Sequence, residues 1–254
     1  MCRVLAYVGA PRSLAELLVE PAHSLEVQSY APKEMEEALL NADGFGVAWY
    51  TAGREEPARY RTILPMWADQ NVRDFAGHVR SGHVLAAVRS ATPGIGHGLA
   101  NTQPFVHGPL TFLHNGFIRD FRRGAARRLR EGLGDAAYHA LGGNSDSEHL
   151  FGVFLDDWLE HGDLVRGLQE TLRRADAARD GARALLSLVV SDGTTVAAVT
   201  QAFDGTAPTL YRRDASEGTL IASEPTTPSE GWTRLEPGVV TTVTMRPASP
   251  SDSP

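Results

Sequence analysis

The chain has 254 residues, a formal net charge of −7 at neutral pH and a single cysteine. That length suits one large globular domain. The acidic balance argues against nucleic acids and anionic membranes as partners, because both bind clustered positive charge. There is no apolar run of about 18 residues and no signal-peptide pattern at the start, so we expect a cytoplasmic protein. One cysteine cannot form an intramolecular disulfide or a multi-cysteine metal site, which leaves packing or reactivity as its role.

Short apolar or alternating runs bounded by Gly, Pro or Asn are typical of strands. In the first half of the chain such runs predict strands at 3–9, 45–50, 83–91 and 110–114. A second set predicts a meander of antiparallel strands, at 184–191, 194–201, 209–213, 219–223 and 239–245.

The middle of the chain is helical in pattern. Residues 145–161 place apolar side chains on one stripe, and Ser145 with Glu148 forms a capping-box pattern that marks the start of this helix. Two more helices are expected, an arginine-rich one at 119–131 and one at 163–178. The order strands, helices, strands leaves little room for βαβ repeats, so the sequence predicts an α+β fold with antiparallel sheets covered by helices.

The folded domain is expected to cover 2–246. The remaining residues, 247–254, are rich in Pro and Ser and poor in apolar side chains, so we expect them to be disordered.

The position of the cysteine is informative. Cys2 directly follows the initiator methionine and is small enough for Met1 to be removed, which would place a thiol and a free α-amine on one residue. An α-amine has a reference pKa of about 7.7–8.0, so its neutral fraction can act as the base for the adjacent thiol. The alternative is that Cys2 is a small buried residue at the start of a strand.

Residues 114–116 read His114-Asn115-Gly116 after an apolar run. By propensity alone, Asn-Gly at the end of a strand is a turn. The functional alternative is an oxyanion hole, because a side-chain amide beside a glycine N–H offers two donors that can converge on one point.

Two charged residues have the chemistry to bind an amino acid. Arg89 ends an otherwise apolar strand, where a guanidinium is costly unless a carboxylate or another partner meets it. Asp146 lies in the first turn of the predicted helix at 145–161, where the helix dipole alone could account for it. The two residues could instead bind the carboxylate and the ammonium of one ligand.

The segment Asn41-Ala42-Asp43-Gly44 could be only a turn that leads into a strand, but Asn41 and Asp43 are candidates for supporting an active-site loop. The nine histidines are scattered and no metal-binding motif is present, so no metal is expected.

In combination, these motifs resemble the class II glutamine amidotransferase family of N-terminal nucleophile hydrolases. The resemblance covers roughly residues 2 to 225 and rests on Cys2, Asn41 to Gly44, Arg89 with Thr92, Gln103-Pro104-Phe105, His114 to Gly116 and Ser145 to Glu148. It implies a four-layer αββα sandwich of antiparallel sheets.

The resemblance also implies roles for individual residues. Cys2 would be the nucleophile, with Asn115 and the Gly116 N–H as the oxyanion hole. The substrate-binding residues would be Arg89, Thr92, His114 and Asp146, with Arg89 and Thr92 on the α-carboxylate and Asp146 on the α-ammonium. The implied reaction hydrolyses a γ-glutamyl amide and needs no cofactor or ATP.

Within this family, the start of the chain, Gln28 to Pro32 and the segment from Asn41 to Gly46 resemble the amidohydrolases of ergothioneine biosynthesis. That resemblance implies hydrolysis of γ-glutamyl-hercynylcysteine S-oxide, a small-molecule substrate. One alternative is a glutaminase subunit that supplies ammonia to a separate synthase. Another is a non-catalytic module that binds γ-glutamyl compounds. The sequence leaves the oligomeric state open.

Overall fold

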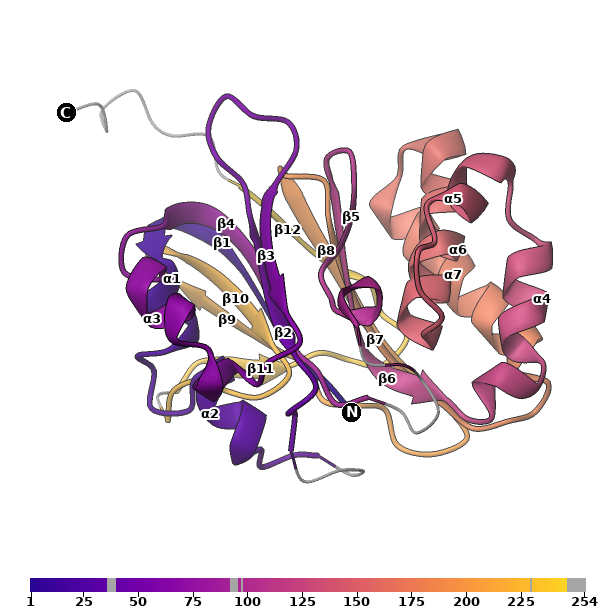
Figure 1. Ribbon diagram of the computed structural model, residues 1–254, viewed down its shortest axis with the longest axis horizontal. Coiled ribbons are helices and arrows are strands. Elements are labelled where there is room, and N and C mark those ends of the chain that lie inside the picture. The colour runs from indigo at the N-terminus through magenta and orange to yellow at the C-terminus, as the bar shows by residue number, and fades with distance from the viewer. Residues whose placement is uncertain (36–39, 92–95, 97, 229, 246–254) are drawn as a thin grey trace.

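Two stacked β-sheets with helices on both outer faces form the molecule (Figure 1). The structure is a computed structural model that describes residues 1–35, 40–91, 96, 98–228 and 230–245. The predicted disordered tail at 247–254 lies outside the described residues. Within the described part of the chain, no helix is both long and apolar enough to cross a membrane.

The first sheet has seven strands and contains the start of the chain in its interior. Its strands are antiparallel to their neighbours. They lie in the order β11 (Trp232–Arg234), β9 (Tyr211–Ala215), β10 (Gly218–Ala222), β1 (Arg3–Ser13), β4 (Arg80–Val88), β2 (Phe45–Trp49) and β3 (Ala58–Thr62).

The second sheet has five antiparallel strands. Their order is β12 (Thr241–Thr244), β8 (Thr195–Phe203), β7 (Ala184–Ser191), β6 (Leu110–Ile118) and β5 (Phe105–His107). Side chains of both sheets alternate between two faces. One face of each sheet packs against the other sheet around Val4, Leu85, Leu113 and Val189.

Helices bury the two outer faces. The first sheet is covered by α1 (Leu14–Leu18), α2 (Leu25–Tyr30), α3 (Gln70–Phe75) and the 3₁₀ turn η1 (Met66–Ala68). The second is covered by η3 (Phe121–Arg123), α4 (Ala125–Glu131), α5 (Asp135–His139), α6 (Asp146–His161) and α7 (Leu164–Arg179), and η2 (Leu99–Asn101) precedes β5. The α+β prediction and the four-layer αββα arrangement are therefore confirmed.

Several local predictions were wrong. The late strands do not form one meander, because β9, β10 and β11 join the first sheet whereas β7, β8 and β12 join the second. The helix predicted at 119–131 is divided into η3 and α4, which meet at Gly124. The capping box is only half formed. The Ser145 hydroxyl accepts from the Glu148 N–H, but the Glu148 carboxylate accepts from Gly142 and Gly143 instead.

A polar bridge joins the two sheets across the space between them. The His83 Nε2 and Ser191 Oγ atoms lie 2.7 Å apart. The Tyr50 hydroxyl donates to the Pro109 carbonyl at 2.7 Å and lies 2.8 Å from Thr111 Oγ1. Burial raises the pKa of Tyr50 to about 12 and lowers that of His83 to about 4. Both groups are therefore neutral near pH 7.

Candidate active site

Cys2 lies immediately before β1, the strand that pairs with β4 on one side and β10 on the other. Its side chain is 7% exposed, and its sulfur is 3.9 Å from the Ser90 carbonyl oxygen and 3.9 Å from Gln103 Nε2. Alternation along the strand places Cys2 on the same face as Val4, which points between the sheets. The thiol thus lies at the end of the space between the sheets.

Gln103 connects the thiol to the second sheet. Its side-chain Nε2 donates to the His114 carbonyl at 2.8 Å, and its Oε1 accepts from the His114 N–H at 2.5 Å. This two-way contact fixes the backbone just before Asn115. From the sequence, Gln103 was named only as part of the motifs that carry the family resemblance, so its contact with the thiol is a finding of the structure.

Residues 114–116 lie inside β6 and do not form the turn that their propensity favours. Asn115 pairs with Ser187 on β7, is fully buried and faces between the sheets, as does Leu113 two residues earlier. Neither amide atom of its side chain has a hydrogen-bond partner within the described part of the chain. A buried amide without partners is costly, so Asn115 is a candidate for binding a ligand.

Gly116 cannot be replaced without strain. Its φ is +149°, and a Cβ added there would lie 1.8 Å from the Leu185 carbonyl oxygen. The close approach of β7 therefore requires glycine directly after Asn115. By propensity Gly116 was predicted to form a turn, whereas in the structure it allows two strands to pack closely.

Arg89 directly follows β4 and is only 5% exposed. Its guanidinium donates to the carbonyl oxygens of Asp43 at 3.4 Å and Gly96 at 3.3 Å, and no carboxylate pairs with it among the described residues. Two long bonds to carbonyls leave much of the planar donor fork available. A buried cation in this state is stabilised by an anionic ligand.

Asp43 holds the backbone at Arg89 and just after it. Its carboxylate accepts from the Ala91 N–H at 2.7 Å, and its own N–H donates to the Arg89 carbonyl at 3.0 Å. Asn41 is fully buried, and its side chain donates to the Gln28 carbonyl at 3.3 Å. The contacts of both residues are those of loop supports. Thr92, predicted to lie beside Arg89 in the site, is outside the described residues.

Asp146 begins α6 and reaches β6 just beyond Gly116. One carboxylate oxygen accepts from the Ile118 N–H at 3.1 Å and the other from the Ser147 N–H at 2.9 Å. Each oxygen retains acceptor capacity, so the 3%-exposed carboxylate can also meet an ammonium.

His114 supports the same region from the helical side. Its Nδ1 lies 2.8 Å from Ser147 Oγ on α6, and the imidazole is fully buried. Burial lowers the pKa of His114 and outweighs the opposing effects of Asp146 and the Leu185 carbonyl. The ring is therefore neutral near pH 7 and joins β6 to the first turn of α6.

Met1 is itself buried beside these residues and packs against Phe117 and Leu185. A separate hollow of about 500 Å³, lined by Arg122, Arg130 and His149 among others, contains none of the candidate site residues. The contacts of Cys2, Gln103, Arg89 and Asp43 join one end of the first sheet to β6. The site therefore brings together segments far apart in the sequence.

Comparisons with known proteins give the family. Residues 15–213 match the model of the class II glutamine amidotransferases. The chain is 32% identical over 232 residues to the γ-glutamyl-hercynylcysteine sulfoxide hydrolase of Mycobacterium tuberculosis, which covers 91% of this chain and 88% of that protein. It is 31% identical to the probable glutamine amidotransferase DUG3 of Saccharomyces cerevisiae, over 96% of this chain and 82% of the yeast protein.

A solved structure supports the same assignment. The glutamine aminotransferase class-II domain protein of Silicibacter pomeroyi superimposes with a TM-score of 0.70 at 29% identity, over 97% of this chain and all of that one. Sequence and fold agree over nearly the whole length. The chain therefore belongs to the class II glutamine amidotransferase family.

Proposed function

We propose that this chain hydrolyses γ-glutamyl amides, with Cys2 as the nucleophile once Met1 has been removed. The observation that carries the proposal is the position of the Cys2 thiol at the end of the two sheets, where the Asn115 amide, which has no partner among the described residues, faces the same space. Membership of the family and the hydrolase-named relatives make the protein an amidohydrolase.

Charged groups would hold the glutamyl end of the substrate. The Arg89 guanidinium binds the α-carboxylate and the Asp146 carboxylate binds the α-ammonium, because each is buried and has hydrogen-bonding capacity left. Thr92 joins Arg89 at the carboxylate. Asn41 and Asp43 keep the surrounding loops in place, and His114 orients β6.

The reaction proceeds in two halves. The Cys2 sulfur attacks the γ-carbonyl carbon while its proton passes to the Cys2 α-amine, and the oxyanion accepts hydrogen bonds from the Asn115 side chain and the Gly116 N–H. Collapse of this intermediate breaks the C–N bond, and the α-ammonium protonates the departing amine. Water then attacks the thioester, gives a proton to the α-amine, and releases glutamate and the thiol.

The relatives favour one substrate. The match to the mycobacterial hydrolase leads us to propose γ-glutamyl-hercynylcysteine S-oxide, cleaved to glutamate and hercynylcysteine S-oxide. The match to the probable yeast glutamine amidotransferase favours a second candidate, hydrolysis of glutamine to supply ammonia to a synthase.

A glutamate-release assay separates the candidates. Protein whose intact mass shows loss of Met1 is incubated with γ-glutamyl-hercynylcysteine S-oxide or glutamine at equal concentrations. Faster release from the S-oxide supports the proposal, and faster release from glutamine supports the second candidate. The Cys2→Ala variant is the control for both. Glutamate release by that variant at the wild-type rate would contradict the assignment of the nucleophile.

A further inference from the structure

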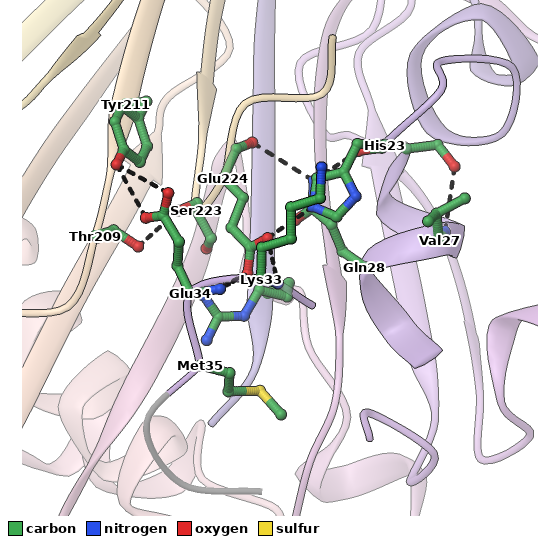
Figure 2. Close-up of polar contacts among 12 residues, drawn as sticks. His23, Val27, Gln28, Lys33, Glu34, Met35, Thr209, Tyr211, Ser223 and Glu224 are labelled. Carbon is green, nitrogen blue, oxygen red and sulfur yellow. Dashed lines mark hydrogen bonds and ion pairs between the residues drawn. The ribbon is translucent and has the colours of Figure 1, made fainter. Parts of the chain in front are cut away.

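A buried ionic cluster lies directly behind the nucleophile and fixes a segment that the proposed mechanism does not use. The Glu224 cluster consists of Arg3, His23, Glu224 and the backbone N–H groups of Lys33 and Glu34. Figure 2 shows His23, Lys33 and Glu34 around Glu224. Glu224 follows β10 by two residues, and both it and Arg3 are 1% exposed. Arg3 is adjacent in sequence to Cys2, so the cluster is tied to the strand that positions the thiol.

Glu224 accepts at both carboxylate oxygens. Oε2 lies 2.7 Å from His23 Nε2 and accepts from the Lys33 N–H at 2.9 Å. Oε1 accepts from the Glu34 N–H at 3.1 Å and lies 3.4 Å from Arg3 Nη1. Burial by itself raises the pKa of Glu224, but these donors together outweigh it, so the pKa lies below its ordinary value. Glu224 is therefore ionised near pH 7 and holds residues 33 and 34 by their backbone.

The side chain of Glu34 adds a second anchor, because its carboxylate accepts from the Tyr211 hydroxyl at 2.9 and 3.1 Å (Figure 2). Met35 comes next in the chain. Its side chain packs against the apolar cluster of Met1, Phe117 and Leu185, and its sulfur lies 3.7 Å from Asn41 Nδ2. Anchoring of residues 33 and 34 thus determines where Met35 lies.

That apolar cluster adjoins the reaction centre. Phe117 and Leu185 are paired residues on β6 and β7, and Phe117 is on the same face of β6 as Asn115, two residues earlier. Met1 is bonded to the Cys2 nitrogen and covers both side chains. Removal of Met1 produces the free α-amine and at the same time uncovers Phe117, Leu185 and Met35.

We propose that Met35, Phe117 and Leu185 form the subsite for the amine that leaves, and that Glu224 is a positioning residue that holds Met35 in it. The inference rests on the proposed function and extends it to the substrate class, which is γ-glutamyl amides whose nitrogen carries a large substituent with an aromatic or apolar part, such as the imidazole ring of hercynylcysteine S-oxide. The glutamyl end requires charged partners and lies at Arg89 and Asp146. The three apolar side chains fit the other end, where a thioether and a ring contact apolar groups favourably.

The test compares two substrates on protein that has lost Met1. γ-Glutamyl-p-nitroanilide carries an aromatic substituent on the amide nitrogen, whereas glutamine carries none. We expect Met35→Ala to lower kcat/KM for the anilide about tenfold, chiefly through KM, and to change that for glutamine less than about twofold. Met35→Leu restores most of the loss. Glu224→Gln removes the charge but keeps the shape of the side chain, and it also lowers kcat/KM for the anilide.

Matched controls come from the surface of the same chain. Met245→Ala and Glu217→Gln replace exposed residues of the same types and should leave kcat/KM for both substrates unchanged. If Met35→Ala lowers kcat/KM equally for the two substrates, the effect is a general structural one and the subsite is overturned. Unchanged kinetics on the anilide would also overturn it.

Failure of the proposed function gives a different result, in which processed wild-type protein turns over neither substrate. The subsite is then tested by calorimetric binding of the anilide to Cys2→Ala and to Cys2→Ala/Met35→Ala. Weaker binding by about tenfold in the double variant supports the subsite, and equal binding overturns it.

Discussion

His83 should make the folded protein sensitive to mild acid. The imidazole lies between the two sheets, with its Nε2 2.7 Å from Ser191 Oγ and its ring centroid 4.8 Å from that of Tyr50. Burial lowers the pKa of His83 from 6.5 to about 4 and outweighs the opposing effect of Asp192. Between these two values the unfolded chain binds a proton that the folded chain does not.

The sign and size of the effect follow from this difference. Because the folded pKa is depressed, stability is complete above pH 6.5 and falls as the pH drops toward 4. A difference of 2.5 pH units corresponds to about 3 kcal/mol, since each unit is worth about 1.4 kcal/mol. That loss is a large fraction of the stability of an ordinary domain, about 5–15 kcal/mol.

The perturbation is His83→Gln, which keeps a polar side chain but cannot titrate. We expect the free energy of unfolding of the variant to be about 1 kcal/mol lower than that of the wild type near neutral pH, because the hydrogen bond to Ser191 is altered. Its further loss on acidification should be about 3 kcal/mol smaller than that of the wild type. Urea unfolding at neutral pH and near pH 4 measures both quantities, with the exposed His78→Gln as control. Equal acid sensitivity in His83→Gln and wild type would refute the reasoning.

Three substitutions test the candidate site. Asn115→Ala should reduce kcat about 10²- to 10³-fold with little change in KM, because an oxyanion donor acts in the transition state; a change confined to KM would reassign the residue. Arg89→Ala should weaken capture of the glutamyl end by about 2–4 kcal/mol, mostly in KM, and unaltered KM in steady-state assays would contradict this. Gly116→Ala should lower the free energy of unfolding by at least about 2 kcal/mol, or Tm by about 4–8 °C, because the new Cβ meets the Leu185 carbonyl. Gly77→Ala should have no such effect, because no atom lies within 4 Å of a Cβ added there. A thermal melt that shows equal effects for both glycines would disprove the clash.

Features encoded by neighbouring residues could be read from the sequence. The start of α6 at Asp146 follows from the Ser145 cap, and the short apolar runs of β7 and β8 predicted both strands within a few residues. These signals are local, because a cap bonds three residues along the chain and a strand repeats every two. The fold class followed from the order of such elements together with the family resemblance.

Features that depend on partners distant in sequence could not be read. The sequence patterns of β10 and β12 do not show which of the two sheets each strand joins, so the division of the late strands between the sheets was missed. The role of Gly116 depends on the approach of Leu185, and that of Gln103 on His114 and Cys2. Glu224 has no local motif, since its partners are Arg3, His23 and the Lys33–Glu34 backbone.

The interior place of β1 has a consequence for how such an enzyme can change. A strand hydrogen-bonded on both sides, by β4 and by β10, moves only when much of the sheet opens. Cys2 is thus mounted on one of the stiffest parts of the molecule, whereas Met35 lies in a connection outside the strands. If Met35 lines the proposed amine subsite, substitutions in that connection would alter which amine is accepted and leave Cys2 where it is, so selectivity and reactivity could evolve separately.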